Sequence, residues 1–207
     1  AGVSFDCPPK SITAIAGPNN SGKSTVLNLL SKIIDCQSGK ILLGEAKLKN
    51  INASHYRNEI AYASEWIPRS HITVLQSLKQ LNPDVNPTII TRACEDHNFL
   101  SRLKSHNLSL DSELIEIADP ILNKHLAIMS LFIQKAQIIL IDINFNAHYQ
   151  QEKELFTYLI EQLKGEKTIF YTTLCAELMQ LADNALILDK GSVAHFGPIQ
   201  KKSETHA

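Results

Sequence analysis

The sequence predicts an α/β fold with a mixed, mostly parallel sheet and an inserted helical subdomain. Short apolar segments alternate with segments of helical periodicity, a pattern typical of parallel strands covered by helices. From about 73 to 135 the periodicity is mostly helical and no strand interrupts it. The 207 residues, 44% of them hydrophobic, are enough for one domain with a sizeable core. We expect a single domain over 1–207, with a core formed by about 1–72 and 128–207 and a helical subdomain over about 73–127.

Four elements are expected before the helical stretch. SITAIAG (11–17) is an apolar strand that runs into glycine, and a helix over 23–35 follows it. SGKILLG (38–44) and EIAYASE (59–65) predict two further strands. The apolar face of the helix is formed by Val26, Leu29, Leu30, Ile33 and Ile34.

The rest of the chain continues the alternation of strands and helices. Asn86 and Pro87 form a cap and first-turn pair that opens a helix over 87–104. A later helix is expected over 152–165, with its end marked by Gly165. Apolar strands are expected at 137–142, 168–173 and 184–189.

Charge and cysteine usage narrow the class of protein. Lys+Arg 20 against Asp+Glu 21 leaves no basic excess, so nucleic acid is not an expected partner. The four cysteines are widely spaced and form no CxxC pair, which favours reduced thiols over a zinc or redox site. No apolar run reaches the length of a membrane-spanning helix. A cytosolic domain with reduced thiols is the simplest interpretation.

The strongest local motif is GPNNSGKST (17–25), which fits G-x-x-x-x-G-K-[ST] between a predicted strand and a predicted helix. Gly17 and Gly22 allow a tight turn that brings backbone N–H groups close to phosphate oxygens. Lys23 supplies a positive charge for the β- and γ-phosphates, and Ser24 offers a hydroxyl to Mg²⁺. The motif predicts a P-loop NTPase (RecA-like) core. Its phosphate-binding residues are Gly17, Pro18, Asn19, Asn20, Ser21, Gly22, Lys23, Ser24 and Thr25.

One position of the loop departs from the commonest pattern. Asn20 stands where many such loops have another glycine. Asparagine is among the few other residues that tolerate a positive φ, so the change is mild.

The order of these features resembles the nucleotide-binding domain of an ATP-binding cassette (ABC) transporter over nearly the whole chain. The start, GVSFDCPPKSITAIAGPNNSGKST, is similar to the family's entry into its phosphate loop. QLADNALILDKGSVAHFGP is similar to its closing strands, with Gly191 and Gly197 in their usual places. The style of HITVLQSL and PTIITRACEDHNFLSRL is closest to exporter-type members, including those of type I secretion systems.

The resemblance implies ligands and partners. A domain of this family binds ATP and Mg²⁺, contacts a transmembrane permease domain at the cytoplasmic face of the membrane, and pairs head-to-tail with a second ABC domain. It implies a metal site formed by Ser24, Asp142 and Glu65. Asp142 ends the strand that carries the family's magnesium aspartate, and Glu65 stands in place of the glutamine-loop Gln. A carboxylate can hold Mg²⁺ directly or through water; an ordinary strand-end glutamate is an equally supported interpretation of Glu65.

Several positions depart from the family's catalytic pattern. Ile143 replaces the glutamate that should follow Asp142, and an aliphatic side chain can neither accept a proton nor orient water. Tyr149 stands in place of an aspartate, and Thr173 or Leu174 in place of the switch histidine. No catalytic residue is therefore expected in this chain. Loss of general-base catalysis typically costs about 10²–10⁴-fold in rate.

The family's LSGGQ signature is replaced as well. ADPIL (118–122) stands in its place, and Asp119 followed by Pro120 is a strong helix start. Asp119 would present a negative charge to an approaching phosphate, so we interpret it as an ordinary helix cap without a ligand. Together with the lost base and histidine, this change affects both nucleotide sites of a dimer.

These departures predict a degenerate ABC domain that binds Mg-ATP and hydrolyses it weakly or not at all. A non-hydrolysing pseudo-ATPase, serving as a structural or regulatory module of a transport or secretion complex, is the alternative. A P-loop kinase or GTPase is a further alternative, but in NKHL (123–126) Leu126 replaces the aspartate of a guanine-reading NKxD. A DNA-repair ABC ATPase is disfavoured by the near-neutral charge and the lack of long coiled-coil heptads.

Two expectations concern aromatic residues. ABC domains stack adenine on an aromatic residue upstream of the phosphate loop, and Phe5 lies too close to Gly17 for that role. We therefore expect the sequence to be a piece of a longer polypeptide with a membrane domain before it. Trp66 falls where the family contacts the coupling helix of the membrane domain. An anchoring role there and partial burial against the helical subdomain are equally supported.

Overall fold

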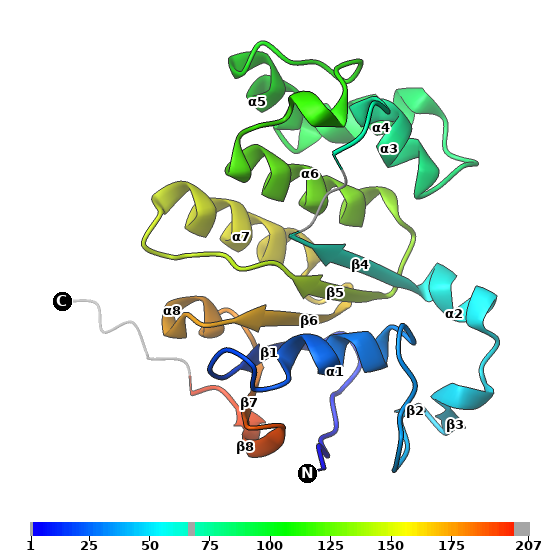
Figure 1. Ribbon diagram of the computed structural model, residues 1–207, viewed down its shortest axis with the longest axis vertical. Helices are drawn as coiled ribbons and strands as arrows, with labels where there is room; N and C mark the ends of the chain where they lie inside the picture. The colour runs from blue at the N-terminus through cyan, green and yellow to red at the C-terminus, as the bar shows by residue number, and fades with distance from the viewer. Residues whose placement is uncertain (1, 66–68, 201–207) are drawn as a thin grey trace.

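Figure 1 shows a computed structural model of the protein, which describes residues 2–65 and 69–200. Its centre is a six-stranded sheet in the order β4-β5-β6-β1-β7-β8. β8 is antiparallel to β7, and the other neighbouring strands are parallel. The sheet confirms the predicted α/β fold with mixed, mostly parallel strands. They are β1 (Ile12–Ala16), β4 (Ile60–Ser64), β5 (Ile138–Asp142), β6 (Thr168–Thr173), β7 (Asn184–Asp189) and β8 (Ser192–Pro198).

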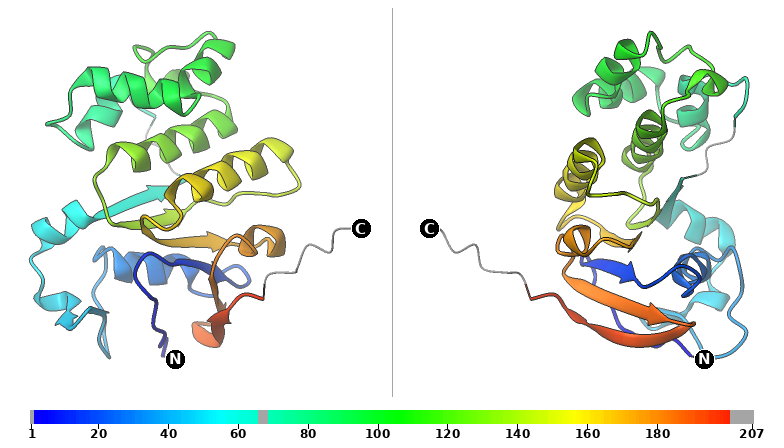
Figure 2. Two further views of the ribbon diagram at one scale, coloured as in Figure 1. Left: turned by 180° about the vertical axis from the view of Figure 1, so that it is seen from behind. Right: turned by 60° about the vertical axis from the view of Figure 1, so that its left-hand side comes forward.

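Helices cover both faces of this sheet. Leu27 of α1 shares an apolar cluster with Leu140 of β5 on one face, and Phe156 of α7 shares another with Ile141 on the opposite face. The right view of Figure 2 shows α1 and α7 on opposite sides of the strands. Because the strands pack on both faces, they read as continuous apolar runs in the sequence. The helices are α1 (Lys23–Leu30), α6 (Pro120–Ile133), α7 (Gln150–Leu163) and α8 (Ala176–Met179).

A group of short helices lies beyond the β4 edge of the sheet (Figure 1). They have an apolar cluster of their own, which includes Leu122 and Met129 of α6. Ile128 and Leu131 of the same helix belong instead to the cluster against the sheet. α6 therefore connects the helical group to the core, and the mostly helical character predicted for this part of the chain is confirmed. The short helices are α3 (Val74–Gln80), α4 (Pro87–Asp96), α5 (Phe99–Ser105) and the 3₁₀ helix η2 (Leu114–Glu116).

The prediction of one helix over 87–104 was wrong, because the structure has two helices there, and the break lies between Asp96 and Phe99. The start of the first helix is as expected, since the Asn86 side chain accepts a hydrogen bond from Thr88 N at 2.9 Å. Asn98 then adopts a left-handed conformation, with φ 58, and separates α4 from α5. The turn lets Phe99 become fully buried in the helical cluster.

The helix predicted over 23–35 ends early, at Leu30. Lys32 has a φ of 58, and Ile33 N donates back to Asn28 O at 3.0 Å, so the helical hydrogen-bond pattern stops there. Ile33 is 63% exposed and does not join the apolar face that its spacing predicted. The buried residues of α1 are Val26 and Leu27, so the packed face of the helix ends before Ile33.

The strand predicted over 38–44 is also much shorter. Only Leu42–Leu43 (β2) pairs, with Ala46–Lys47 (β3), in a small hairpin that turns at Gly44, where φ is 59. The hairpin is separate from the main sheet, and both leucines are exposed. A 3₁₀ helix η1 (Leu48–Asn50) and α2 (Ala53–Glu59) lead from it to β4.

Other expectations agree with the structure. α7 matches the helix expected over 152–165, and Gly165 follows it with a φ of 77, which glycine adopts readily. The four cysteines, all within the described residues, are free thiols. In the two described ranges, no helix has both the length and the apolarity to cross a bilayer.

Candidate functional site

The phosphate-loop motif forms a tight turn between β1 and α1. Gly17 has a φ of 140, and a Cβ atom there would lie 2.2 Å from Leu188 O and 2.8 Å from Ser21 Oγ. Gly22 precedes α1 with a φ of 103. These glycines are needed because the first is in contact with β7 and both have left-handed backbone conformations.

Asn20 adopts a φ of 62, the conformation that the sequence predicted for it. The neighbouring Ser21 is 2% exposed, and its Oγ has no hydrogen-bond partner among the residues that the structure describes. Its backbone is fixed on both sides, because its N–H donates to Pro18 O and its carbonyl accepts from Gly191 N. The loop therefore contains a buried hydroxyl with unused hydrogen-bonding capacity, which fits a loop that binds a polar ligand.

Lys23 lies over the loop that it follows. Its Nζ donates to Gly17 O and to Pro18 O, each at 2.8 Å. Partial burial lowers the pKa of Lys23, while the charge of Asp142 acts in the opposite direction. The ammonium group is therefore held at the loop and interacts electrostatically with the carboxylate at the end of β5. Ser24 and Thr25, in the first turn of α1, are exposed.

Asp142, at the end of β5, is contacted by hydroxyl groups from both neighbouring strands. Thr172 Oγ1 of β6 donates to its Oδ1 at 2.8 Å, and Tyr62 OH of β4 contacts its Oδ2 at 3.4 Å. The same tyrosine hydroxyl lies 3.2 Å from Asn28 Oδ1 of α1. Burial raises the pKa of Tyr62, and the charge of Asp142 adds to the effect, so the hydroxyl stays protonated. Sequence reasoning missed both partners of Asp142 and the link to Asn28; only the strand order shows that β4 and β6 flank β5.

Glu65 directly follows β4 and lies beside Asp142. Its N–H donates to Asp142 O at 3.3 Å, which continues the ladder in which Ser64 pairs with Asp142. The side chain is exposed. The two carboxylates therefore lie at the same edge of the sheet. Trp66, the next residue, is outside the described residues.

Ile143 faces the core. It is fully buried, and it belongs to the apolar cluster that contains Phe145 and Phe156. The loop that follows is fixed by a buried ion pair between Lys124 of α6 and Glu152 of α7, whose atoms are 2.6 Å apart. No group capable of accepting a proton is present at this position.

Main-chain groups of that loop form hydrogen bonds with both side chains of the ion pair. Lys124 Nζ also donates to Asn144 O at 2.7 Å, and Asn146 N donates to Glu152 Oε2 at 2.8 Å. Lys124 is also the second residue of NKHL, which lies inside α6. Its ammonium group is therefore committed to the loop, which disfavours a guanine-reading role.

The two remaining catalytic positions have different exposures. Tyr149 is 62% exposed at the start of α7, and Leu174 is 53% exposed just after β6. Thr173 is buried, and its Oγ1 accepts from Cys175 N at 3.0 Å, which fixes the turn into α8. None of the three side chains is a histidine or a carboxylate.

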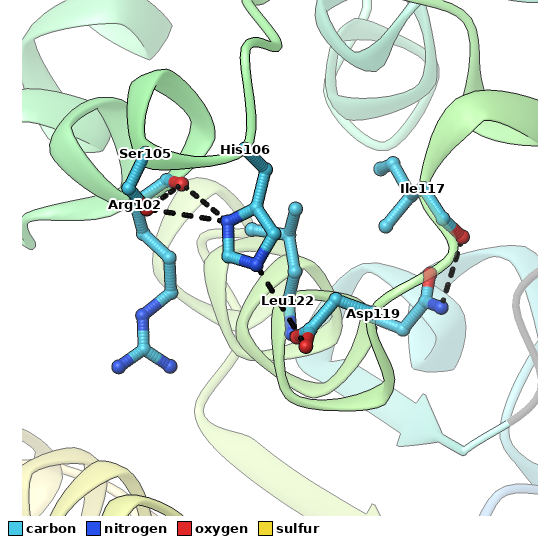
Figure 3. A network of polar contacts seen from close by, with 7 residues as sticks. Arg102, Ser105, His106, Ile117, Asp119 and Leu122 are labelled. Carbon is cyan, nitrogen blue, oxygen red and sulfur yellow. Dashed lines mark hydrogen bonds and ion pairs between the residues drawn. The ribbon is translucent and has the colours of Figure 1, made fainter.

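At the signature position, Asp119 caps α6 as predicted. Its Oδ1 accepts from Leu122 N at 2.6 Å, and Pro120 occupies the first turn. Figure 3 shows His106 facing the same carboxylate from the end of α5, with Nε2 3.7 Å from Asp119 Oδ2. Asn123 N donates to Asp119 O at 3.1 Å, so two of the first amides of α6 are bonded to this one residue.

The tight phosphate loop, its lysine and the nearby strand-end carboxylate define a P-loop nucleotide-binding domain. The family model described as "ABC transporter" matches residues 1–146, and the chain belongs to this family.

The curated relatives include exporters by name. An "ATP-dependent lipid A-core flippase" of Photobacterium profundum is 24% identical over 199 residues, which cover 94% of this chain and 34% of that protein. A "Beta-(1-->2)glucan export ATP-binding/permease protein NdvA" of Agrobacterium vitis is 24% identical over 198 residues, with the same coverage of 94% and 34%. The chain spans about a third of the length of these relatives.

A solved structure shows the same fold. The "Structure of a bacterial Atm1-family ABC exporter with ATP bound" superposes with a TM-score of 0.82 at 18% identity, over 95% of this chain and 35% of that chain. The predicted resemblance to exporter-type ABC domains is thus confirmed.

Proposed function

We propose that this chain is the nucleotide-binding domain of an ABC exporter, and that it binds Mg-ATP and hydrolyses it weakly or not at all. The observation that carries the proposal is the contrast between Lys23, held at a formed phosphate loop, and Ile143, fully buried where a base would be needed. The division into a core of about 1–72 and 128–207 and a helical subdomain of about 73–127 belongs to the same proposal.

The phosphates would be bound by the loop 17–25. Its backbone amides, the start of α1 and the Lys23 ammonium all favour an anion at this place. Mg²⁺ usually takes one or two carboxylates together with phosphate oxygens, which fits the set of Ser24, Asp142 and Glu65. A bound Mg²⁺ would supply charge neutralisation to the phosphates; this chain's own residues bind and orient them.

Hydrolysis would be slow because, among the described residues, the positions where the family carries its base and its switch histidine hold side chains that cannot activate water. Ile143 and Leu174 are aliphatic, and loss of a general base typically costs about 10²–10⁴-fold. Asp119 caps its own helix and would repel a phosphate bound to a partner. Both sites of a head-to-tail dimer would therefore lack groups that cleavage needs.

The partners follow from the family. The relatives are about three times longer than the chain, and the NdvA name describes an export permease. We place this domain at the cytoplasmic face of a membrane, in contact with a transmembrane permease domain and with a second ABC domain. Nucleic acid is not proposed as a partner, since the chain has no basic excess.

Calorimetry with ATP and Mg²⁺, followed by a steady-state ATPase measurement, tests the proposal. Lys23→Ala removes a charged donor and is expected to weaken ATP binding by about 10–100-fold. Lys32→Ala is the matched control, because Lys32 Nζ also binds main-chain carbonyls, Leu48 O and Ile51 O, but away from the loop. Binding should persist in the control. An ATPase rate normal for the family and abolished by Lys23→Ala would refute weak hydrolysis; no ATP binding at all would refute the whole proposal.

A non-hydrolysing structural or regulatory module is the second candidate, favoured by the complete burial of Ile143. Single-turnover measurement separates the two. Slow product formation that needs Lys23 supports a slow ATPase, whereas stable binding with no product supports the module.

A further inference from the structure

The carboxylate of Asp142 is held by hydroxyl groups from both neighbouring strands. Thr172 Oγ1 donates to Oδ1 at 2.8 Å from β6, and Tyr62 OH reaches Oδ2 at 3.4 Å from β4. Each carboxylate oxygen therefore has one hydroxyl partner. An oxygen of a carboxylate has room for a second ligand, so these contacts orient Asp142 without excluding a cation.

Strand register explains why these side chains meet. Ser64 pairs with Asp142, and Ile141 pairs with Tyr171, so Thr172 is the next lateral neighbour of Asp142. Side chains two residues apart on a strand share a face, which places Tyr62 on the same face as Ser64. The long tyrosine side chain spans that separation.

Tyr62 also connects this carboxylate to the phosphate loop. Its hydroxyl lies 3.2 Å from Asn28 Oδ1, and Asn28 is on α1, the helix that begins at Lys23. The hydroxyl carries one proton, so it is shared between the helix and the carboxylate. A single side chain thereby fixes the position of Asp142 relative to the helix that follows the loop.

We propose that Tyr62 and Thr172 are positioning residues for Asp142, and that they set the Mg²⁺ concentration that nucleotide binding requires. The inference rests on the proposed function, because it takes Asp142 as the carboxylate that holds Mg²⁺. Partners that orient a metal-binding carboxylate typically change metal affinity by about 10–100-fold when they are removed. Neither residue touches the metal or the nucleotide in this account; both act through Asp142.

The test compares two tyrosines, the half-buried Tyr62 and the buried Tyr56, that both hydrogen-bond to α1. Tyr56 OH donates to Leu30 O at 2.6 Å and has no contact with Asp142, so Tyr56→Phe is the matched control for Tyr62→Phe. Thermal unfolding is followed at fixed ATP while Mg²⁺ is increased, and also with ATP in excess chelator. The readout is the Mg²⁺ concentration at half of the maximal shift, which is independent of any ATPase activity.

Tyr62→Phe is expected to raise that Mg²⁺ concentration by about tenfold, as a lower limit for such partners. Thr172→Val should also raise the Mg²⁺ concentration at half of the maximal shift. Thr172→Ser keeps the hydroxyl and should give the value of the unmodified chain. Tyr56→Phe should leave it unchanged, and binding of ATP in chelator should be the same in all variants.

Each contrary result has a distinct meaning. If Tyr62→Phe and Tyr56→Phe lower the unfolding temperature alike and leave the Mg²⁺ midpoint unchanged, Tyr62 is only structural and the inference is overturned. If the unmodified chain shows no Mg²⁺-dependent stabilisation by ATP, the proposed function fails first, and the inference fails with it.

Discussion

The phosphate loop and the loop 143–149 follow the carboxyl ends of two parallel strands, β1 and β5, but the two loops are stabilised in different ways. The first is held by backbone conformation, with Gly17 against β7 and Lys23 over its own carbonyls. The second is held by side chains, with Ile143 in the core and a buried Lys124–Glu152 pair around its main chain.

The difference separates binding from cleavage. A loop built from backbone amides keeps its anion-binding geometry as long as its glycines remain. Catalytic positions depend on individual side chains, and here one of them has become part of the apolar core. Changes in the loop 143–149 should therefore affect stability and leave ATP binding unchanged, whereas loss of the Lys23 ammonium group in the phosphate loop should weaken ATP binding.

The largest effect is expected from the buried ion pair. Lys124→Ala leaves Glu152 buried without a counter-charge, and the free energy of unfolding should fall by about 3–5 kcal/mol. Lys153→Ala is the control, because its partner Glu177 is 56% exposed, and it should cost no more than about 1 kcal/mol. Urea denaturation measures both. Equal losses would show that the loop is not stabilised by burial of the pair.

A smaller effect is expected when a carboxylate is introduced at position 143. Ile143→Glu puts a carboxylate into an apolar cluster, and we expect a loss of about 2–4 kcal/mol in the free energy of unfolding. Ile143→Val, which keeps the site apolar, should cost about 0.5–1.5 kcal/mol. ATPase activity should not rise in either variant. A stable, active Ile143→Glu protein would mean that the side chain at this position can turn towards the nucleotide.

Acid should weaken the region around α6. His125 is buried there, and burial lowers its pKa to about 4, below its usual value of 6.5. Because the folded state disfavours the protonated form, its stabilising contribution is complete above pH 6.5 and is lost as the pH falls towards 4. Between pH 7 and pH 5 the free energy of unfolding should fall by about 2 kcal/mol.

Urea denaturation at a series of pH values measures this effect, with His125→Phe expected to flatten the dependence. His195 is exposed, so His195→Asn should keep the dependence of the unmodified chain. A slope that survives His125→Phe would assign the acid sensitivity to other groups.

The smallest effect concerns the cap at the signature position. Asp119→Ala removes the acceptor for Leu122 N and should cost about 1 kcal/mol. Asp119→Asn keeps an acceptor of similar capping strength and should cost only a few tenths of a kcal/mol. Unfolding of the two variants side by side measures the difference. If both lose the same amount, the carboxylate contributes through contacts other than the cap, such as the one with His106.

Much of the fold was predictable because its strands are short, nearly continuous apolar runs between turn residues. The strands at β1, β4, β5, β6 and β7 were found in this way, since burial on both faces leaves a clear signal. The errors occurred where tertiary contacts decide the outcome. Ile33 continues the helical spacing of α1, yet no element covers it, and Asn98 ends a helix that local periodicity would continue. Leu42 is apolar like a core strand but lies in an exposed hairpin.

The sequence by itself determined the shape of the phosphate loop, because Gly17, Asn20 and Gly22 have backbone preferences that act locally. It also determined that position 143 carries no proton acceptor, since isoleucine cannot become one in any fold. Only the tertiary structure decided what surrounds Asp142, because Tyr62 and Thr172 reach it across a sheet whose strand order is not written in local spacing. It likewise decided that Ile143 packs in the core, since that depends on which helices cover the sheet.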